Sequence, residues 1–120
     1  MKILIIDDST INNILLENIL SERGYEIYSI LNGNSAIDKI EEVQPDLILL
    51  DIMMPEVSGF DVLRKLKENE IQVPVIIISA YDSDKFKKLS KTLGAESYIL
   101  KPVEADFLVS QIQKVHKSQN

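Results

Sequence analysis

The segment Leu47–Gly59 reads LILLDIMMPEVSG, and it decides the fold class. It opens with four apolar residues that do not alternate with polar ones, a pattern that predicts a short strand buried on both faces. Asp51 follows directly at the end of this strand, and a loop with Pro55 comes next. Strands of this kind occur in parallel sheets that are covered by helices on both sides.

Similar apolar runs occur on both sides of this segment. They alternate with longer stretches in which apolar residues recur at helical spacing, a pattern typical of β-α units. The predicted strands are Ile3–Ile6, Tyr25–Ile30, Leu47–Leu50, Val75–Ile78 and Ser97–Leu100. The second strand mixes Glu26 and Ser29 with apolar neighbours, so we expect it at an edge of the sheet.

Five helices are predicted in the remaining segments. They are Thr10–Glu22, Asn34–Glu42, Gly59–Glu68, Asp84–Leu93 and Glu104–His116. The first helix carries Ile11, Ile14, Leu15 and Ile19 on one apolar face. The sequence thus predicts one α/β domain, with a doubly wound five-stranded parallel sheet and five helices.

Composition excludes several classes of protein. The chain has 120 residues and a formal net charge of -6, which argues against general binding to nucleic acid or to anionic membranes. It has no cysteine and a single histidine, so disulfides, thiolate zinc sites and histidine cages are excluded. No apolar run approaches the roughly 18 residues that would suggest a membrane span. A cytoplasmic location is therefore expected.

Polar side chains follow four of the five predicted strands. Asp7 and Asp8 come after the first strand, Asp51 after the third, Ser79 after the fourth and Lys101 after the fifth. Because parallel strands end at one common edge, where open α/β sheets bind ligands, these side chains are expected to lie together. A lone Asp in such a place is usually a cap or a turn residue, but the combined set is unlikely to arise by chance.

The chemistry of the set indicates a metal and a phosphate. Three neighbouring carboxylates repel one another, and a divalent cation relieves this repulsion. Oxygen ligands of this kind suit Mg²⁺, with Mn²⁺ as an alternative, and Mg²⁺ sites commonly include phosphate oxygens. A lysine and a hydroxyl supply donors for the remaining phosphate oxygens.

These residues resemble the response-regulator receiver domain of two-component signalling, from Lys2 to about His116. The matching motifs are the acid pair Asp7-Asp8, the pattern D-x-x-M-P-x-x-x-G in residues 51–59, Ser79-Ala80 and Lys101-Pro102. The resemblance implies a flavodoxin-like sheet with strand order 2-1-3-4-5. It also implies a receiver domain over residues 1–116, with 117–120 as a polar tail or the start of a linker.

The resemblance implies that Asp51 is the phosphoacceptor. It also implies that Asp8, Asp51 and the backbone carbonyl of Met53 hold Mg²⁺, and that Asp7 acts through a metal-bound water. Lys101 would bind the phosphoryl oxygens. The implied reaction is the chain's own phosphorylation and dephosphorylation at aspartate, so the chain is not expected to be an enzyme that turns over an external substrate.

The resemblance assigns further roles around this centre. Ser79 and Tyr98 are implied as switch residues, while the backbone N–H groups of Ile52 and Ala80 would bind phosphate. Structural roles are implied for Pro55, Gly59 and Pro102, and the peptide bond before Pro102 is expected to be cis. The implied phosphodonor is a sensor histidine kinase or a histidine phosphotransfer protein.

The family's usual output surface consists of the fourth helix, the fifth strand and the fifth helix, and it would contact an output domain or a target protein. The fourth helix carries four lysines opposite its apolar face, namely Lys85, Lys87, Lys88 and Lys91. Such a row is usually a solvated face, and the alternative is a docking surface. His116, near the end of the last helix, is placed favourably for the helix dipole.

Other functions remain as alternatives. A receiver-like module that acts without phosphorylation would share the fold. Phosphatases of the haloacid-dehalogenase type also use an aspartate nucleophile, but they carry a second Asp two residues beyond it, where this chain has Met53. A flavin carrier would need a phosphate loop rich in Ser, Thr and Gly after the first strand, where Asp7 and Asp8 would repel the phosphate.

Overall fold

The structure, a computed structural model, describes residues 1–119 and contains one parallel sheet. Its strands are β1 (Lys2–Ile6), β2 (Glu26–Ile30), β3 (Leu47–Leu50), β4 (Val75–Ser79) and β5 (Ser97–Leu100). They lie in the order β2-β1-β3-β4-β5, so the expected order is confirmed and β2 is an edge strand. Ile6, at the end of β1, is paired with Ile30 and Leu50, which brings the carboxyl ends of three strands level.

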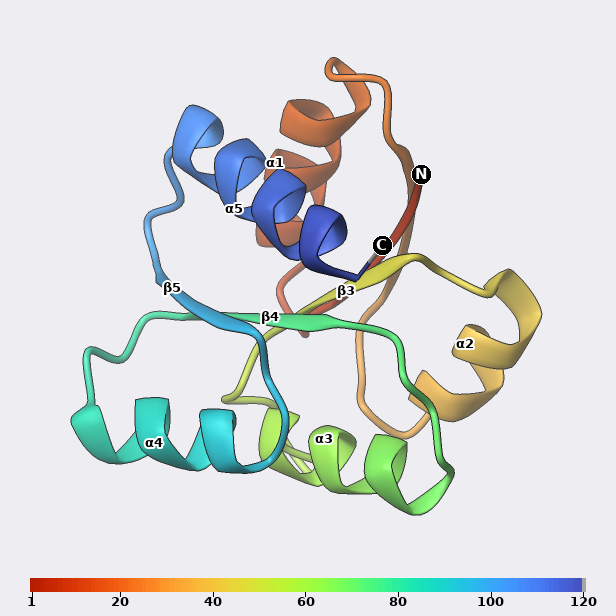
Figure 1. The fold of residues 1–120 in the computed structure, drawn as a ribbon, viewed down its shortest axis with the longest axis vertical. Coiled ribbons are helices and arrows are strands. Elements are labelled where there is room, and N and C mark those ends of the chain that lie inside the picture. The colour runs from red at the N-terminus through yellow and green to blue at the C-terminus, as the bar shows by residue number, and fades with distance from the viewer. Residues whose placement is uncertain (120) are drawn as a thin grey trace.

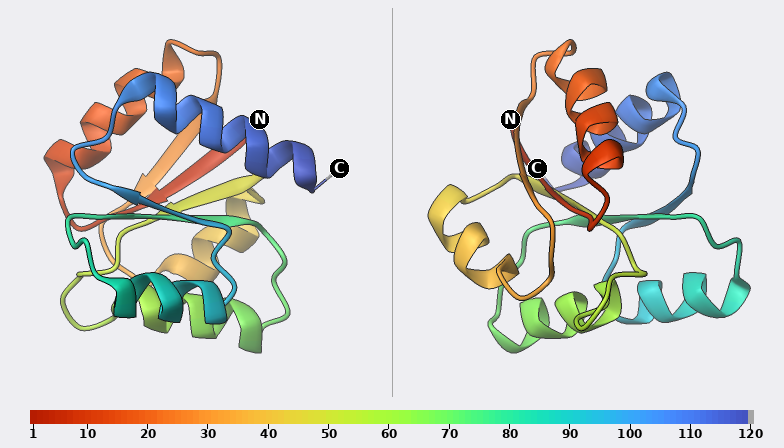
Figure 2. Two further views of the ribbon diagram at one scale, coloured as in Figure 1. Left: turned by 60° about the vertical axis from the view of Figure 1, so that its left-hand side comes forward. Right: turned by 180° about the vertical axis from the view of Figure 1, so that it is seen from behind.

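Helices cover both faces of the sheet (Figure 1). They are α1 (Thr10–Ser21), α2 (Ala36–Val43), α3 (Gly59–Glu68), α4 (Asp84–Thr92) and α5 (Ala105–Ser118). The two views of Figure 2 show α1 and α5 on one side of the sheet and α2, α3 and α4 on the other. Within residues 1–119, none of these helices combines the length and the apolarity that a membrane span requires.

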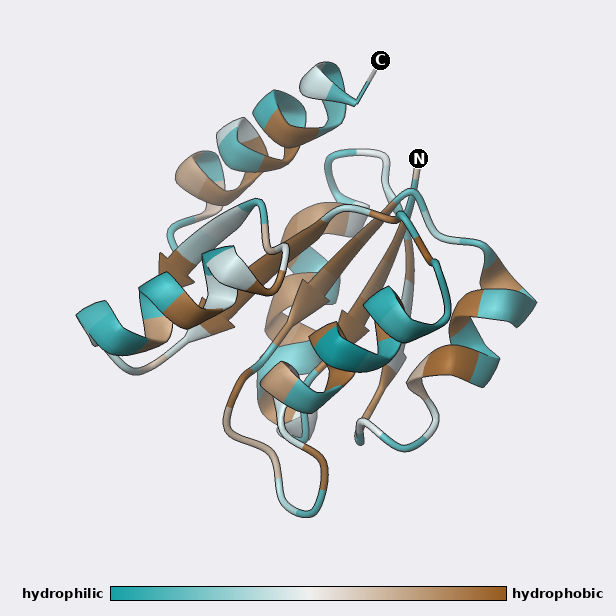
Figure 3. Ribbon diagram, turned by 60° about the horizontal axis from the view of Figure 1, so that its bottom comes forward, coloured by the Kyte–Doolittle hydropathy of each residue, from teal (hydrophilic) through white to brown (hydrophobic). Residues whose placement is uncertain are grey.

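The core consists of two apolar layers because successive strand residues point to opposite faces. On β3, Ile48 and Leu50 pack with α2 and α3, while Leu47 and Leu49 pack with α1 and α5. Figure 3 shows mainly apolar strands in the centre, while the helices around them carry both apolar and polar residues. The buried strands thus form a rigid base for the loops at their carboxyl ends.

The apolar face expected for α1 is not the buried one. Ile11 is 71% exposed, Ile14 51% and Leu15 55%, whereas the buried residues of this helix are Asn13, Leu16 and Leu20. At 3.6 residues per turn these two sets lie on opposite sides of the helix. The prediction of the inward face was therefore wrong, because α1 is apolar on both sides and packing selects the side with the two leucines.

Several element bounds differ slightly from expectation. Ser79 is the last residue of β4 and not the first residue after it, because its carbonyl still accepts a hydrogen bond from the Lys101 N–H at 2.8 Å. Helix α5 extends to Ser118, two residues beyond the expected end at His116. Lys117 thus continues the helix, and residue 120, the last of the expected tail, lies outside the described residues.

Candidate functional site

Three carboxylates meet at the carboxyl edge of the sheet. Asp7 and Asp8 follow β1, Asp51 follows β3, and one carboxylate oxygen from each lies within 4.8 Å of the others. Asp7 is 2% exposed and Asp51 is 7% exposed, while Asp8 is exposed. The expected acidic cluster is therefore present, with two of its members largely removed from water.

The sheet itself fixes the two buried carboxylates. The Asp51 N–H donates to the Ile6 carbonyl at 2.9 Å, and the Asp7 N–H donates to the Ile30 carbonyl at 3.2 Å. These bonds extend the strand pairing by one residue, so both side chains leave a backbone that is held in place. Asp7 Oδ1 also accepts the Ser9 N–H at 2.9 Å, which connects it to the start of α1.

Lys101 supplies the positive charge of the site. Its Nζ lies 3.1 Å from Asp7 Oδ2 and 3.7 Å from Asp51 Oδ1, and its side chain is 20% exposed. The Lys101–Pro102 peptide bond is cis, which confirms that expectation. One ammonium group between two buried carboxylates offsets only part of their charge, so the pocket retains an excess of negative charge.

The pKa of Asp51 is raised to about 6, and the largest cause is burial of the carboxyl. Repulsion from Asp7 and Asp8 contributes to the rise, while Lys101 and a hydrogen bond from the backbone of Met53 oppose it. Ionised Asp51 is therefore costly in the protein without a bound cation. A divalent cation beside the three carboxylates would remove this cost, so the donor set suits one.

The raised pKa predicts that Asp51→Asn stabilises the fold in a pH-dependent manner. Below about pH 4 the carboxyl is protonated in both the folded and the unfolded chain, so its ionisation contributes no difference. Between about pH 4 and pH 6 the unfolded chain loses this proton first, so the wild type loses stability as the pH rises. By pH 7 the free energy of unfolding of Asp51→Asn should exceed that of the wild type by on the order of 2 kcal/mol.

Urea denaturation of both proteins across this pH range measures the difference. Because Mg²⁺ would neutralise the carboxylates, adding it at pH 7 should narrow the gap between wild type and variant. A gap that stays constant with pH would contradict the assignment of the raised pKa to Asp51.

The loop after Asp51 is held by the start of α3. The Gly59 N–H donates to the Ile52 carbonyl at 2.8 Å, so the loop closes on itself. Ser58 caps the helix by accepting the Asp61 N–H, and Asp61 in turn accepts the Ser58 N–H. Asp51 is thereby anchored from both sides. Pro55 is exposed within this loop, as is Met53, which is 49% exposed beside Asp51.

Ser79 and Tyr98 are joined through Tyr81. Ser79 is fully buried, and its Oγ accepts the Tyr81 N–H at 3.0 Å. The Tyr98 hydroxyl donates to the Tyr81 carbonyl at 2.6 Å. Because the Ser79 oxygen acts as an acceptor here, its proton remains available for another group. Ile52 is buried and Ala80 is exposed, each directly after a site residue.

Two contributors were not predicted from the sequence. Tyr81 bridges Ser79 and Tyr98 through its backbone, and nothing in its residue type indicates this. Asn13 is 4% exposed and its side-chain amide donates to the Asp7 carbonyl at 3.1 Å. The signal for Asn13 was its spacing, since it lies three residues before Leu16 on the face that packing buries.

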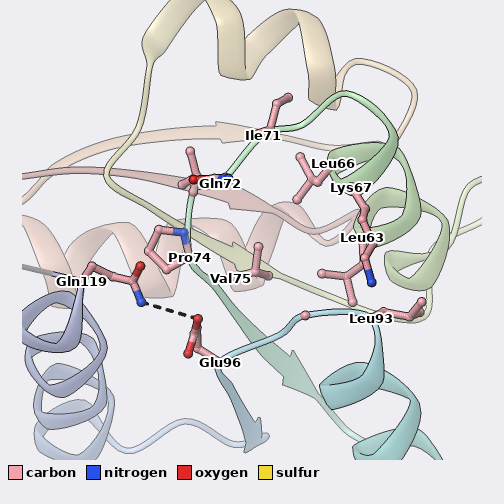
Figure 4. Close-up of a pocket in the computed structure, with 12 residues that line it drawn as sticks. Leu63, Leu66, Lys67, Ile71, Gln72, Pro74, Val75, Leu93, Glu96 and Gln119 are labelled. Carbon is pink, nitrogen blue, oxygen red and sulfur yellow. Dashed lines mark hydrogen bonds between the residues drawn. The ribbon is translucent and has the colours of Figure 1, made fainter.

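The pocket shown in Figure 4 lies away from the carboxylates. It has a volume of about 310 Å³ and is lined by the end of α3, the segment before β4 and the turn after α4. Leu63, Leu66 and Leu93 are among its apolar residues, and Glu96 accepts a hydrogen bond from Gln119 at 3.5 Å. It contains no cluster of catalytic groups, so the candidate site is the acidic edge.

A comparison of the sequence with protein families identifies a family for most of the chain. The model described as the response regulator receiver domain matches residues 3–113. These residues include the three carboxylates Asp7, Asp8 and Asp51, together with Ser79 and Lys101.

Solved structures of the same architecture are similar over nearly the whole chain. The signal receiver domain of a putative Luxo repressor protein from Vibrio parahaemolyticus is 34% identical, with a TM-score of 0.91 and coverage of 98% of this chain and 90% of that one. The BeF3-activated receiver domain of RstA from Klebsiella pneumoniae is 29% identical, with a TM-score of 0.91 and coverage of 97% and 98%. Chemotaxis protein CheY4 from Vibrio cholerae is 26% identical, with a TM-score of 0.89 and coverage of 95% and 97%.

Proposed function

The chain belongs to the response-regulator receiver domain family, and on that premise we propose that Asp51 accepts a phosphoryl group from a phosphohistidine of another protein in a Mg²⁺-dependent reaction. The observation that carries this proposal is that the Asp51 carboxylate lies beside those of Asp7 and Asp8, with Lys101 Nζ 3.7 Å from Asp51 Oδ1, and that this carboxylate is costly to keep ionised.

We propose that a partner protein supplies the phosphodonor. The chain given in the sequence has one histidine, His116, and it lies in the last turn of α5. A sensor histidine kinase or a histidine phosphotransfer protein would supply the donor. In the transfer, the bond from phosphorus to the donor nitrogen breaks as the bond from phosphorus to an Asp51 oxygen forms. The donor leaves as neutral imidazole when its second nitrogen carries a proton.

Mg²⁺ would be held by Asp8, Asp51 and the backbone carbonyl of Met53, with Asp7 acting through a water, and it would neutralise charge on the incoming phosphoryl group. The side chain of Lys101 would pair with a phosphoryl oxygen. The Ser79 hydroxyl and the N–H groups of Ile52 and Ala80 would donate to the others. No further residue type is required for this chemistry, because phosphoryl transfer depends mainly on positioning and charge.

Phosphorylation adds a charge of about -1.5 to -2 at this edge. Ser79 is already tied to Tyr81, and Tyr81 to Tyr98, so a change in the position of the Ser79 hydroxyl would reach the side chain of Tyr98 through one residue. We assign Tyr98 the role of reporting this change on the surface formed by α4, β5 and α5. An output domain or a target protein would bind there.

A receiver domain is not a metabolic enzyme, and we propose that the catalysis of this chain is limited to phosphorylation and dephosphorylation of Asp51. The receiver unit would comprise residues 1–116. No direct binding of nucleic acid by this unit is proposed.

One experiment tests the proposal. The protein is incubated with acetyl phosphate and Mg²⁺ and compared with Asp51→Asn by intact mass, with a chelator as a second control. The wild type should gain the mass of one phosphoryl group, and both controls should gain none.

Beryllofluoride, the activator named for the Klebsiella relative, provides a second readout by NMR of the backbone amides. Shifts are expected at residues 79–81 and at Tyr98 in the wild type alone. If the wild type gained no mass and its amides did not respond, the chain would be an interaction module that acts without phosphorylation.

A further inference from the structure

Asn13 is a buried amide among the leucines of α1. It is one of the three buried residues of this helix, and the other two, Leu16 and Leu20, pack in the apolar layer beneath α1 and α5. Asn13 is 4% exposed, and its side-chain oxygen Oδ1 has no hydrogen-bond partner among the described residues. An apolar residue of the same shape would avoid the cost of burying this oxygen. Packing alone therefore does not explain an asparagine at this position.

The side-chain nitrogen of Asn13 forms a contact outside the helix. Its Nδ2 donates to the Asp7 carbonyl at 3.1 Å. Side chains of a helix lean toward its amino end, so a residue in the first turns of α1 can reach back to the loop before the helix. The Asn13 backbone is held as well, because its N–H donates at 3.0 Å to the carbonyl of Ser9, the residue that caps α1. Asn13 thus connects α1 to the end of β1.

The peptide unit between Asp7 and Asp8 is the group that Asn13 holds. The Asp7 carbonyl and the Asp8 N–H lie in one plane, so a hydrogen bond to the carbonyl also restrains the orientation of the chain as it enters Asp8. The peptide before it is fixed by β2, since the Asp7 N–H donates to the Ile30 carbonyl at 3.2 Å. The backbone at Asp7 is therefore anchored by a strand on one side and by Asn13 on the other.

The Asp8 side chain depends on its backbone more than the Asp7 side chain does. The Asp7 carboxylate accepts the Ser9 N–H at 2.9 Å and pairs with Lys101 Nζ at 3.1 Å. The Asp8 carboxylate is exposed, and within residues 1–119 it has no comparable hydrogen bond or ion pair. One of its oxygens nevertheless lies within 4.8 Å of oxygens of Asp7 and Asp51. The direction of the Asp8 side chain is therefore determined mainly by the peptide that Asn13 holds.

We propose that Asn13 is a positioning residue for the metal site, because its amide holds the Asp7–Asp8 peptide and so directs the Asp8 carboxylate toward Asp51. The inference rests on the proposed function where it concerns Mg²⁺. Without the amide, the Asp7 carbonyl would be buried and would lack this donor, which is costly. A rotation of the peptide toward another donor would relieve the cost, and it would move Asp8 away from the other two carboxylates.

Asn13→Leu tests this role, because leucine has the same number and branching of side-chain atoms but no hydrogen-bond donor. The affinity for Mg²⁺, measured by NMR titration of the backbone amides, should fall about tenfold, as is usual when a group that orients a metal ligand is removed. Asn13→Ala removes the donor without adding volume and should show a similar loss. If both variants bound Mg²⁺ as tightly as the wild type, the positioning role would be overturned.

Leu20→Ala is the control for a general loosening of α1. This substitution opens a cavity on the same buried face of the helix but leaves the bond from Asn13 to the Asp7 carbonyl in place. Leu20→Ala should therefore denature at a lower urea concentration than Asn13→Leu and still bind Mg²⁺ as the wild type does. A loss of affinity in Leu20→Ala as large as that in Asn13→Leu would overturn the proposal, because the cause would then be the packing of the helix.

A measurement without Mg²⁺ separates the role of Asn13 from the proposed function. In isotope-labelled protein, the chemical shift of the Asp7 carbonyl carbon responds to the hydrogen bond that this carbonyl accepts. Asn13→Leu should change this shift and that of the Asp8 amide, whereas Leu20→Ala should leave both close to the wild type. An unchanged Asp7 carbonyl shift in Asn13→Leu would overturn the proposal. If the wild type does not bind Mg²⁺, the proposed function fails, and the carbonyl shift alone decides whether Asn13 holds the peptide.

Discussion

Gly59→Ala should lower the free energy of unfolding by about 3 kcal/mol and weaken Mg²⁺ binding at the same time. A Cβ on Gly59 would contact the Asp51 carbonyl oxygen, would lie 2.8 Å from the Ile52 Cα and 3.1 Å from the Asp51 carbonyl carbon. These are backbone atoms at the end of a buried strand and in the loop that follows Asp51, so they cannot rotate away as a side chain would. The loop has to move, and Asp51 moves with it.

Urea denaturation and titration with Mg²⁺ measure the two effects of Gly59→Ala. Gly24→Ala is the matched control, because a Cβ there has no neighbour within 4 Å and the cost arises only from the positive φ of 88°. We expect Gly24→Ala to lose about 1 kcal/mol and to bind Mg²⁺ as the wild type does. Equal losses of Mg²⁺ affinity in both variants would show that Gly59 has no specific role at the site.

Lys101→Met should lower the free energy of unfolding by about 2 kcal/mol at pH 7 without Mg²⁺. The substitution leaves the Asp7 and Asp51 carboxylates buried with no neighbouring cation, and it raises the pKa of Asp51 further because Lys101 is the charge that lowers it. Since Mg²⁺ would replace part of the missing positive charge, it should stabilise Lys101→Met more than it stabilises the wild type.

Lys87→Met is the control for this effect. The Lys87–Asp82 pair is shorter, at 2.7 Å, but its side chains are 39% and 70% exposed, against 20% and 3% for Lys101 and Asp7. Solvent screens an exposed pair, so Lys87→Met should cost less than about 1 kcal/mol and should not alter the response to Mg²⁺. If thermal and urea denaturation ranked the two variants in the opposite order, distance and not burial would determine the contribution of each pair.

The placement of the acidic site could be predicted because it depends on topology. Parallel strands end at one edge, so Asp7, Asp51 and Lys101 had to meet once the five strands were identified. The strand order came from the family resemblance, and the structure has the same order. Neither the placement of the site nor the strand order required knowledge of side-chain conformations.

The orientation of α1 could not be predicted from periodicity alone. Its two opposite faces are both apolar, and the choice between them depends on what each face contacts. Leu16 and Leu20 pack against the sheet, and the buried Asn13 donates its side-chain amide to the Asp7 carbonyl. That acceptor belongs to another element, so it is not visible in the helix sequence.

The link between Ser79 and Tyr98 could not be predicted from the sequence for a similar reason. Both residues could be named, but the bridge is the backbone of Tyr81, in the loop between β4 and α4. A backbone bridge depends on loop conformation, to which almost any residue type can contribute. The sequence therefore indicates the two ends of the link but not its middle.

The outward face of α1 also affects the colloidal behaviour of the protein. Three exposed apolar side chains form a strip on this face that does not contribute to the core, namely Ile11, Ile14 and Leu15. At neutral pH the net charge of -6 keeps copies apart. Acidification protonates the carboxylates and removes this repulsion, while the strip remains unchanged. Precipitation on mild acidification would thus originate from a helix surface in fully folded molecules and not from unfolding.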